Sequence, residues 1–415
     1  MKNVCIIGGG AAGLMAAHAA AKNGNRVILF EKNEKLGKKI YITGKGRCNF
    51  TNCVPPEEFM QNIVRGEKFS RGALYAFPPE NTLSFFEEHG MPIKIERGNR
   101  AFPVSDHASD VTKTLEIACK RVGVQFHLNE KAEKIITKSD MSDIGIMPRV
   151  VELQTDKGKY ACDYVIVATG GLSYPSTGST GDGYLFAQEL GHSVTDLKCG
   201  LCGINIKEEF CKDLQGLTLK NVSICIKNGE KAVYEEFGEL LFTHFGVSGP
   251  IILSASSIIN RLPMPNLRAY IDLKPALDEQ TLDKRLLRDF EAYKNKRIAN
   301  ALVDLLPQRM ISVVLRCCGI SESKAVNVVT REERARLVKT LKNLPMQPTG
   351  LRGFNEAIIT SGGVALSEVN PKTMESKKVQ GVKFCGEVLD IDAFTGGFNM
   401  QIAFSTGFSA GNTIV

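Results

Sequence analysis

The chain has 415 residues, a net charge of +7, 43% hydrophobic and 23% charged residues, and twelve cysteines. This composition is ordinary for a globular protein and excludes a disordered, collagen-like or small disulfide-stapled chain. No apolar run approaches the ~20 residues that a membrane-spanning helix needs, and the length predicts two or three domains.

The first thirty residues have the pattern of a dinucleotide-binding βαβ unit. Val4–Ile7 is a short buried-strand pattern, and the next six residues, from Gly8 to Gly13, fit G-x-G-x-x-G. In that motif the glycines permit a tight turn, the approach of a pyrophosphate and close packing of helix on strand. An alanine-rich helix is predicted to follow as far as Asn23, where Gly24 would end it. Its N-terminus would present unpaired N–H groups to the phosphates.

An acid follows the second predicted strand, Arg26–Phe30. This acid, Glu31, comes eighteen residues after Gly13, a spacing that suits hydrogen bonds to the two hydroxyls of a ribose. A carboxylate would repel a 2′-phosphate, which disfavours NADP at this site. The motif by itself leaves NAD and FAD open.

Two later stretches favour FAD. Val151–Gly171 predicts a hairpin and then a strand that ends in the sequence ATGG, and Val382–Gly411 predicts a strand, Gly386-Glu387, a glycine-rich turn and a helix. These features resemble the flavoproteins with two dinucleotide-binding domains. In that superfamily the acid after the glycine holds the ribityl chain, and the helix N-terminus faces the flavin pyrimidine. An enzyme that uses only NAD has no need for this third piece.

Because the two halves of the expected FAD site are far apart in sequence, the FAD domain is predicted to be discontinuous. Alternating strands around the turn at Asn228-Gly229, and then a helical pattern broken at Pro307 and Gly319, would form the insertion. The predicted parts are residues 1–190 and 346–415 for the FAD-binding domain, 191–275 for a β module and 276–345 for a helical module.

Longer motifs resemble the BaiN/YhiN-type, aminoacetone-oxidase-like NAD(P)/FAD-dependent oxidoreductases. They are GKKIYITGKGRCNFTN (37–52), NRAFPVSDHASDV (99–111), ATGGLSYPSTGSTGDGY (168–184), LLFTHFGVSGPIIL (240–253) and the stretch 355–407. The resemblance implies an α/β protein with a Rossmann-like FAD-binding domain, an inserted β-barrel-like module and a small helical module. Family members are linked to reduction of a C=C bond in steroid-like acids, to amine oxidation and to dihydrouridine formation in ribosomal RNA.

The candidate cofactor-binding residues come from the glycine motif, the loop Thr43–Asn52, the ATGG turn and the C-terminal stretch. In the loop, Lys45 and Arg47 could offset the negative charge of a reduced flavin or a phosphate, and asparagines could donate to flavin carbonyls. The full candidate set is Gly8, Gly10, Ala11, Ala12, Gly13, Glu31, Lys32, Gly44, Lys45, Gly46, Arg47, Asn49, Thr169, Gly170, Gly386, Glu387, Gly397, Phe398 and Asn399.

Candidates for the catalytic proton donor are His244, beside a glycine-rich turn in the insertion, and Tyr174, just after the ATGG turn. The alternative interpretation of His244 is a hydrogen-bonded loop histidine. Cys48 has no evident base and is interpreted as a packed small residue. Cys199 and Cys202 form a C-x-x-C pair, for which a redox or metal role is the less favoured interpretation.

The segment from Lys274 to Arg352 contains sixteen Lys/Arg and nine Asp/Glu. It therefore accounts for all the excess positive charge of the chain. Ion-paired helices are the preferred interpretation, and a surface for a polyanion such as RNA is the alternative. Scattered cysteines and the immediate first strand predict a cytoplasmic protein without membrane attachment. The oligomeric state is left open.

The predicted function is a reductase in which NAD(P)H delivers hydride to FAD, and FAD delivers it to a C=C bond of a small unsaturated substrate. With one G-x-G-x-x-G in the sequence, the nicotinamide would visit the face that the substrate uses. The alternatives are an enzyme that reduces uridine in ribosomal RNA, an amine oxidase that produces hydrogen peroxide, and a flavin-bearing binding protein without turnover.

Overall fold

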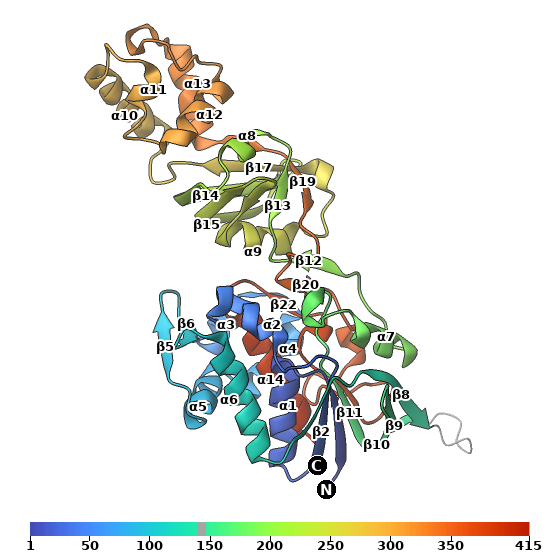
Figure 1. The fold of residues 1–415 in the computed structure, drawn as a ribbon. Helices are drawn as coiled ribbons and strands as arrows, with labels where there is room; N and C mark the ends of the chain where they lie inside the picture. The colour runs from blue at the N-terminus through green and yellow to red at the C-terminus, as the bar shows by residue number, and fades with distance from the viewer. Residues whose placement is uncertain (139–146, 415) are drawn as a thin grey trace. The chain divides into compact units, whose positions relative to one another are not determined.

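A computed structural model describes residues 1–138 and 147–414. The chain forms two compact units, one made of Met1–Gly200 with Phe354–Val415 and the other of Leu201–Gly353. They are called unit 1 and unit 2 below (Figure 1). The first unit therefore contains both ends of the chain, and the second is inserted between them.

The core of unit 1 is a five-stranded parallel sheet. The apolar run Val4–Ile7, in its middle strand, is buried on both faces, which is typical of parallel sheets. Four of its five strands come from the first 170 residues, and the fifth comes from the C-terminal stretch. The spatial order is β21 (Val382–Phe384), β11 (Tyr164–Val167), β1 (Asn3–Ile7), β2 (Arg26–Glu31) and β7 (Gln125–Leu128).

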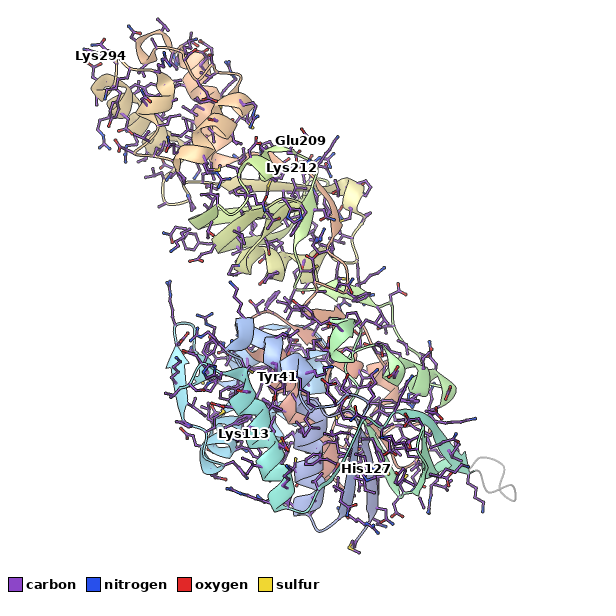
Figure 2. The ribbon with its side chains drawn as sticks, in the orientation of Figure 1. Tyr41, Lys113, His127, Glu209, Lys212 and Lys294 are labelled. Atoms are coloured by element: carbon purple, nitrogen blue, oxygen red, sulfur yellow. The ribbon has the colours of Figure 1, made fainter. Side chains whose placement is uncertain are left out.

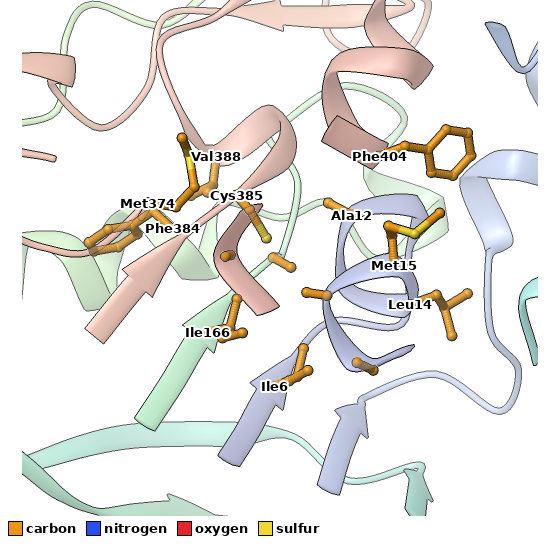
Figure 3. Packing of buried hydrophobic residues seen from close by; sticks show 14 of the residues in the cluster. Ile6, Ala12, Leu14, Met15, Ile166, Met374, Phe384, Cys385, Val388 and Phe404 are labelled. Carbon is orange, nitrogen blue, oxygen red and sulfur yellow. The ribbon is translucent and has the colours of Figure 1, made fainter. Parts of the chain in front are cut away.

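Helix α1 (Ala11–Lys22) follows β1 and packs against α14 (Phe398–Asn412) near the sheet (Figure 1). Small residues allow this close approach, since a Cβ on Gly407 would lie 2.3 Å from the Ala12 carbonyl oxygen. Figure 3 shows the buried side chains around this contact, among them Ala12, Met15 and Phe404. The helix ends as predicted, with Gly24 at φ 81° just beyond it.

Further helices and small sheets of unit 1 surround this core. The helices are α2 (Lys38–Ile42), α3 (Pro56–Met60), α4 (Glu67–Ala76), α5 (Pro79–Glu88), α6 (Ala108–Arg121) and α7 (Asp182–Glu189). The small sheets are β3 (Thr51–Asn52), β6 (Arg100–Pro103) and β5 (Ile93–Glu96); β10 (Lys159–Ala161), β9 (Arg149–Thr155) and β8 (Ala132–Lys138); β12 (Lys198–Gly200) with β20 (Ile359–Ser361); and β22 (Asp392–Ala393) with β4 (Ile63–Arg65).

Unit 2 contains a seven-stranded antiparallel sheet. The hairpin predicted at Asn228-Gly229 is confirmed, because β14 ends at Asn228 and β15 begins at Lys231. The spatial order is β18 (Leu344–Met346), β17 (Leu267–Asp272), β14 (Thr218–Asn228), β15 (Lys231–Thr243), β16 (Gly246–Ser248), β13 (Ile204–Ile206) and β19 (Pro348–Leu351).

The helices of unit 2 follow mostly from the sequence. Pro307 precedes α12 and Gly319 ends it at φ 67°, so both predicted breaks are confirmed. The strand-rich stretch 200–272 also contains α8 (Phe210–Asp213) and α9 (Pro250–Ile259), which the sequence pattern did not predict. The remaining helices are α10 (Glu279–Ala292), α11 (Ile298–Ala301), α12 (Gln308–Cys318) and α13 (Arg331–Lys342).

Candidate functional site

The three motif glycines have different structural roles. A Cβ on Gly13 would lie 1.9 Å from the Gly8 carbonyl oxygen, and a Cβ on Gly8 would lie 2.5 Å from the Ala168 carbonyl oxygen. Both positions therefore need glycine for packing. A Cβ on Gly10 would meet no protein atom within 4 Å. Gly10 faces open space, where a ligand can approach the backbone closely.

The N-terminus of α1 is open to an anion. Gly10 is its N-cap, no side chain caps it, and its first turn contains no acid. Ala11 and Ala12 add only methyl groups there. The unsatisfied N–H groups and the positive end of the helix dipole therefore favour a diphosphate.

Glu31 lies at the end of β2 and is 9% exposed. Its Oε2 accepts a hydrogen bond from Gly9 N at 2.8 Å, and its Oε1 accepts from Asn33 N at 2.9 Å and from Asn33 Nδ2 at 2.6 Å. Because Oε2 accepts only one bond, it keeps an acceptor site for a hydroxyl. The neighbouring Lys32 is engaged elsewhere, because its Nζ lies 2.6 Å from Asp182 Oδ2.

The C-terminal candidate residues lie against α1. Gly386 has φ 73°, and a Cβ there would lie 2.7 Å from Ala12 Cβ. The adjacent turn Thr169-Gly170 belongs to the same region, since a Cβ on Gly170 would lie 3.9 Å from Glu387 Oε2. The structure therefore brings together residues that are more than 370 positions apart in the sequence.

Glu387 is held by three partners that the sequence analysis did not single out. Its Oε1 accepts hydrogen bonds from Ser173 Oγ at 2.7 Å and from Thr360 N at 2.8 Å. Its Oε2 accepts from Lys39 Nζ at 2.7 Å, and Lys39 also reaches Ser173 Oγ at 2.5 Å. The sequence feature that could have drawn attention to Lys39 is its place in the GKKIYITGKGRCNFTN motif. Its partner Glu387 could not be predicted from local sequence, because it lies 348 positions away.

The N-terminus of α14 is a second uncapped helix start. Gly397, at φ 98°, is its N-cap, and the first turn has no capping side chain and no acid. Asn49 Oδ1 is buried nearby without a hydrogen-bond partner among the described residues, and a Cβ on Gly397 would lie 2.8 Å from it. Phe398 packs on Phe59 with ring centroids 4.9 Å apart.

Asn399 uses its side chain inside its own loop. Its Nδ2 donates to the carbonyl oxygens of Ala393 at 2.7 Å and Phe394 at 3.2 Å, and its Oδ1 accepts from Ala393 N at 2.9 Å. These bonds fix the turn that leads into α14. A direct contact of Asn399 with a flavin stays a prediction.

The two helix starts are offset along a common direction. Gly407 packs on Ala12 and Gly411 packs on Ala16, so α1 and α14 run parallel. By this register α14 begins eight residues before the level at which α1 begins, which is about 12 Å at 1.5 Å per residue. The arrangement suits an extended ligand with a diphosphate at α1 and an electron-rich group at α14.

The loop of the GKGR sequence has an unusual backbone. Gly44, Lys45 and Gly46 have φ of 59°, 59° and 87°, so three consecutive residues are left-handed. Strain at a non-glycine residue such as Lys45 is typical of functional loops. Cys48 is fully buried and burial raises its pKa to about 12, which agrees with a packed residue.

Arg47 is neutralised within unit 1. Its guanidinium pairs with Glu96 and Asp106 and lies over the Phe102 ring at 4.4 Å. The hydrogen bond from Arg47 holds the pKa of Glu96 below its usual range, and hydrogen bonds from Lys94 and then Arg47 do the same for the pKa of Asp106. Arg47 therefore joins the loop to the β5–β6 hairpin, and any contact with the cofactor stays a prediction.

The two catalytic candidates belong to different units. Tyr174 lies in unit 1 at φ 52°, half-buried, next to Ser173 of the Glu387 network. His244 is exposed at the turn between β15 and β16 of unit 2, with its ring centroid 5.2 Å from that of Phe245. A role for either as proton donor stays a prediction.

Burial raises the pKa of Cys199, the first cysteine of the C-x-x-C pair. Within the described ranges, no group of three metal-ligating side chains comes together. No helix in the described part of the chain is long and apolar enough to cross a membrane.

Ion pairs neutralise part of the basic segment 274–352. Figure 2 shows Lys294 among the side chains of the helices in unit 2, where its Nζ lies 2.8 Å from Glu291. Such pairs agree with an ion-paired helical surface. The others within the segment include Arg285–Asp289, Lys324–Glu333 and Arg334–Asp283.

A model of the HI0933-like protein Rossmann domain family matches residues 2–413. The chain belongs to this family. The resemblance to the BaiN/YhiN-type flavoproteins and the predicted Rossmann-like FAD-binding fold are thereby confirmed, as is the enzyme class, a FAD-dependent oxidoreductase.

Relatives with different names match almost the whole chain. A ribosomal RNA dihydrouridine synthase of Escherichia coli is 30% identical over 99% of this chain and 97% of its own. A 3-dehydro-bile acid delta(4,6)-reductase of Clostridium scindens is also 30% identical, over 99% of this chain and 98% of its own. A solved 3-ketosteroid delta1-dehydrogenase of Sterolibacterium denitrificans shares the fold, at TM-score 0.52 and 12% identity, over 99% of this chain and 98% of its own.

Proposed function

We propose that the protein is a FAD-dependent reductase that transfers hydride from NAD(P)H to a C=C bond conjugated with a carbonyl group. The observation that carries the proposal is the pair of parallel, uncapped helix starts, with Glu387 and its partners beside the first of them. When bound there, FAD would supply hydride transfer.

The residues of this chain would hold and orient that cofactor. The N–H groups after Gly10 would bind its diphosphate, Glu31 a ribose diol, and Glu387 the polyol chain. The positive end of α14 would stabilise negative charge on the reduced ring, and Asn49 would accept a hydrogen bond from it through its unpartnered Oδ1.

The substrate needs a proton as well as a hydride. Tyr174 and His244 are the proposed donors, because a phenol or an imidazole can donate to the second carbon of the double bond. The nicotinamide is proposed to use the same face as the substrate, because the sequence has one G-x-G-x-x-G motif. Double-reciprocal kinetics would then give parallel lines.

A second candidate substrate is a uridine within RNA, whose C5=C6 bond is conjugated with a carbonyl. Two observations support it. Relatives from E. coli and Haemophilus influenzae, 30% and 29% identical, are named ribosomal RNA dihydrouridine synthases. Lys45, Arg97 and Arg100 also form no ion pair with any residue in the described ranges, and Lys45 lies in the candidate cofactor loop.

One anaerobic experiment tests the proposal. The FAD-loaded protein is mixed with NADH or NADPH and the flavin absorbance is followed; then an enone acid or protein-free ribosomal RNA is added. Bleaching by a nicotinamide, followed by reoxidation with the enone or the RNA, is expected. A separate sample of the oxidised protein is mixed with a small amine in air without nicotinamide. Failure of both nicotinamides to bleach the flavin, or peroxide formed in the sample with the amine, would overturn the proposal.

A further inference from the structure

The tip of the β5–β6 hairpin carries unneutralised positive charge. Arg97 and Arg100 are exposed there, and Lys45 is exposed in the GKGR loop. None of the three forms an ion pair with another described residue, whereas Arg47 and Lys94 are balanced by acids. We call Lys45, Arg97 and Arg100 the cationic rim.

The hairpin tip is fastened to the loop that leads into α14. Asn52 Nδ2 donates to the Gly98 carbonyl oxygen at 3.1 Å and to the Gly396 carbonyl oxygen at 3.0 Å, so one side-chain nitrogen joins the tip to that loop. Cys53 N also donates to the Asn99 carbonyl oxygen at 2.8 Å. The arginines at the tip therefore lie next to the end of the site where the redox-active ring is proposed.

The rim is held in place by the packing beneath it. Arg100 Nε donates to the Arg97 carbonyl oxygen at 3.0 Å, which limits the freedom of its stem. Phe102 packs under the GKGR loop, because a Cβ on Gly44 would lie 3.8 Å from its ring and Arg47 covers its face. The loop and the hairpin thus form one support for Lys45 and Arg100.

We propose that the cationic rim binds phosphates of an RNA substrate and so places an unpaired uracil at the ring end of the site. This rests on the proposed reduction of uridine in RNA. Arginine suits the task because its planar fork binds phosphate oxygens in pairs. Several phosphates follow one another along RNA, which matches three separated cations better than the single carboxylate of a steroid-like acid does.

The test compares two double variants of the FAD-loaded full-length protein, R97A/R100A and the charge-matched control R121A/K157A. Arg121 and Lys157 are also exposed in unit 1, on α6 and in the β9–β10 turn. Binding of a fluorescent oligouridylate and of protein-free ribosomal RNA is measured from low to high salt. Bound FAD and the urea midpoint confirm that each variant is folded.

For R97A/R100A the slope of log K against log salt is expected to fall by about 1.4 and the affinity to fall roughly 10- to 30-fold near 0.1 M salt. The control is expected to bind within a factor of two of the unaltered protein. R97K/R100K should restore most of the slope but less of the affinity, because lysine keeps the charge and loses the fork.

The outcomes distinguish the role of the cationic rim from the proposed function. If the unaltered protein forms dihydrouridine in RNA and R97A/R100A binds RNA as well as the control does, the cationic rim does not bind the RNA, and the proposed reduction of uridine still holds. If the unaltered protein binds neither RNA at low salt, the rim and RNA as substrate are both overturned, and reduction of a small enone can still be measured.

Discussion

Lys39 Nζ lies 2.7 Å from Glu387 Oε2, which joins helix α2 near the start of the chain to the turn before α14 near its end. Both side chains are partly exposed, so an isolated pair of this kind would add little to stability. Ser173 completes the arrangement by bonding to both. We interpret the pair as a device that orients Glu387 for a bound ligand.

The Lys39–Glu387 pair can be tested against a neighbouring lysine. Lys39→Met is expected to weaken FAD binding about 10-fold, about 1.4 kcal/mol, because Glu387 loses the cation that orients it. Lys38→Met is the matched control, since Lys38 pairs with the exposed Glu34 instead. Titration of the flavin-free protein with FAD, followed by flavin fluorescence, measures both. Equal losses in the two variants would contradict the role of Lys39.

Two of the three motif glycines, Gly10 and Gly13, should respond differently to a methyl group. Gly13→Ala is expected to cost several kcal/mol of unfolding free energy, because its Cβ would overlap the Gly8 carbonyl oxygen. Gly10→Ala should leave the urea midpoint of the flavin-free protein unchanged and still reduce FAD affinity at least 10-fold. Normal FAD binding by Gly10→Ala would show that no diphosphate approaches there.

Lys383 predicts a pH dependence of stability. It is fully buried on β21, where its Nζ donates to Thr413 Oγ1 at 2.7 Å, and burial lowers its pKa to about 8. Two ionisable groups, Glu375 and Cys385, act on Lys383, and both raise its pKa against the larger effect of burial.

Because the pKa of Lys383 is near 10.4 in the unfolded chain, the unfolded state binds more protons between pH 8 and 10.4, and stability rises with pH there. Lys383→Met is expected to be about 2 kcal/mol more stable than the unaltered protein at pH 7 and to lack this rise. Urea unfolding of both proteins from pH 7 to 10 measures the difference. Parallel curves for the two proteins would contradict it.

The C-x-x-C pair is expected to have no redox role. Burial raises the pKa of Cys199, which disfavours the reactive thiolate at neutral pH. The variant C199S/C202S should therefore bleach with nicotinamide at the same rate as the unaltered protein. A loss of more than 10-fold in stopped-flow bleaching, with normal FAD content, would show that the dithiol takes part.

The parts of the site that lie within one continuous motif could be predicted from the sequence. The turn at Gly8, the space at Gly10 and the start of α1 follow from one glycine motif, and the place of Glu387 follows from the resemblance. The contact of Lys39 with Glu387 depends on how the two ends of the chain pack, which no local pattern contains. The ion pairs of Arg47 were likewise not predicted, because its acidic partners, Glu96 and Asp106, are distant in sequence.

Helix α9 shows a different limit. Its sequence, PIILSASSII, is a short apolar run, and periodicity alone does not separate a buried helix from a buried strand. The usable signal was Pro250 at its first turn, a position that proline favours in helices. Because the neighbouring stretches of the insertion have strand patterns, this segment was predicted as part of the strand-rich module, and the helix was missed.

The central claim is that this protein, when loaded with FAD, would reduce a conjugated C=C bond. The most direct measurement is single-turnover reoxidation: the FAD-loaded protein is reduced with one equivalent of dithionite without oxygen and mixed with an enone acid or ribosomal RNA. The account predicts return of the oxidised flavin spectrum with one saturated product, or one dihydrouridine, per flavin. Flavin that stays reduced with every such acceptor and reoxidises only with oxygen would contradict it.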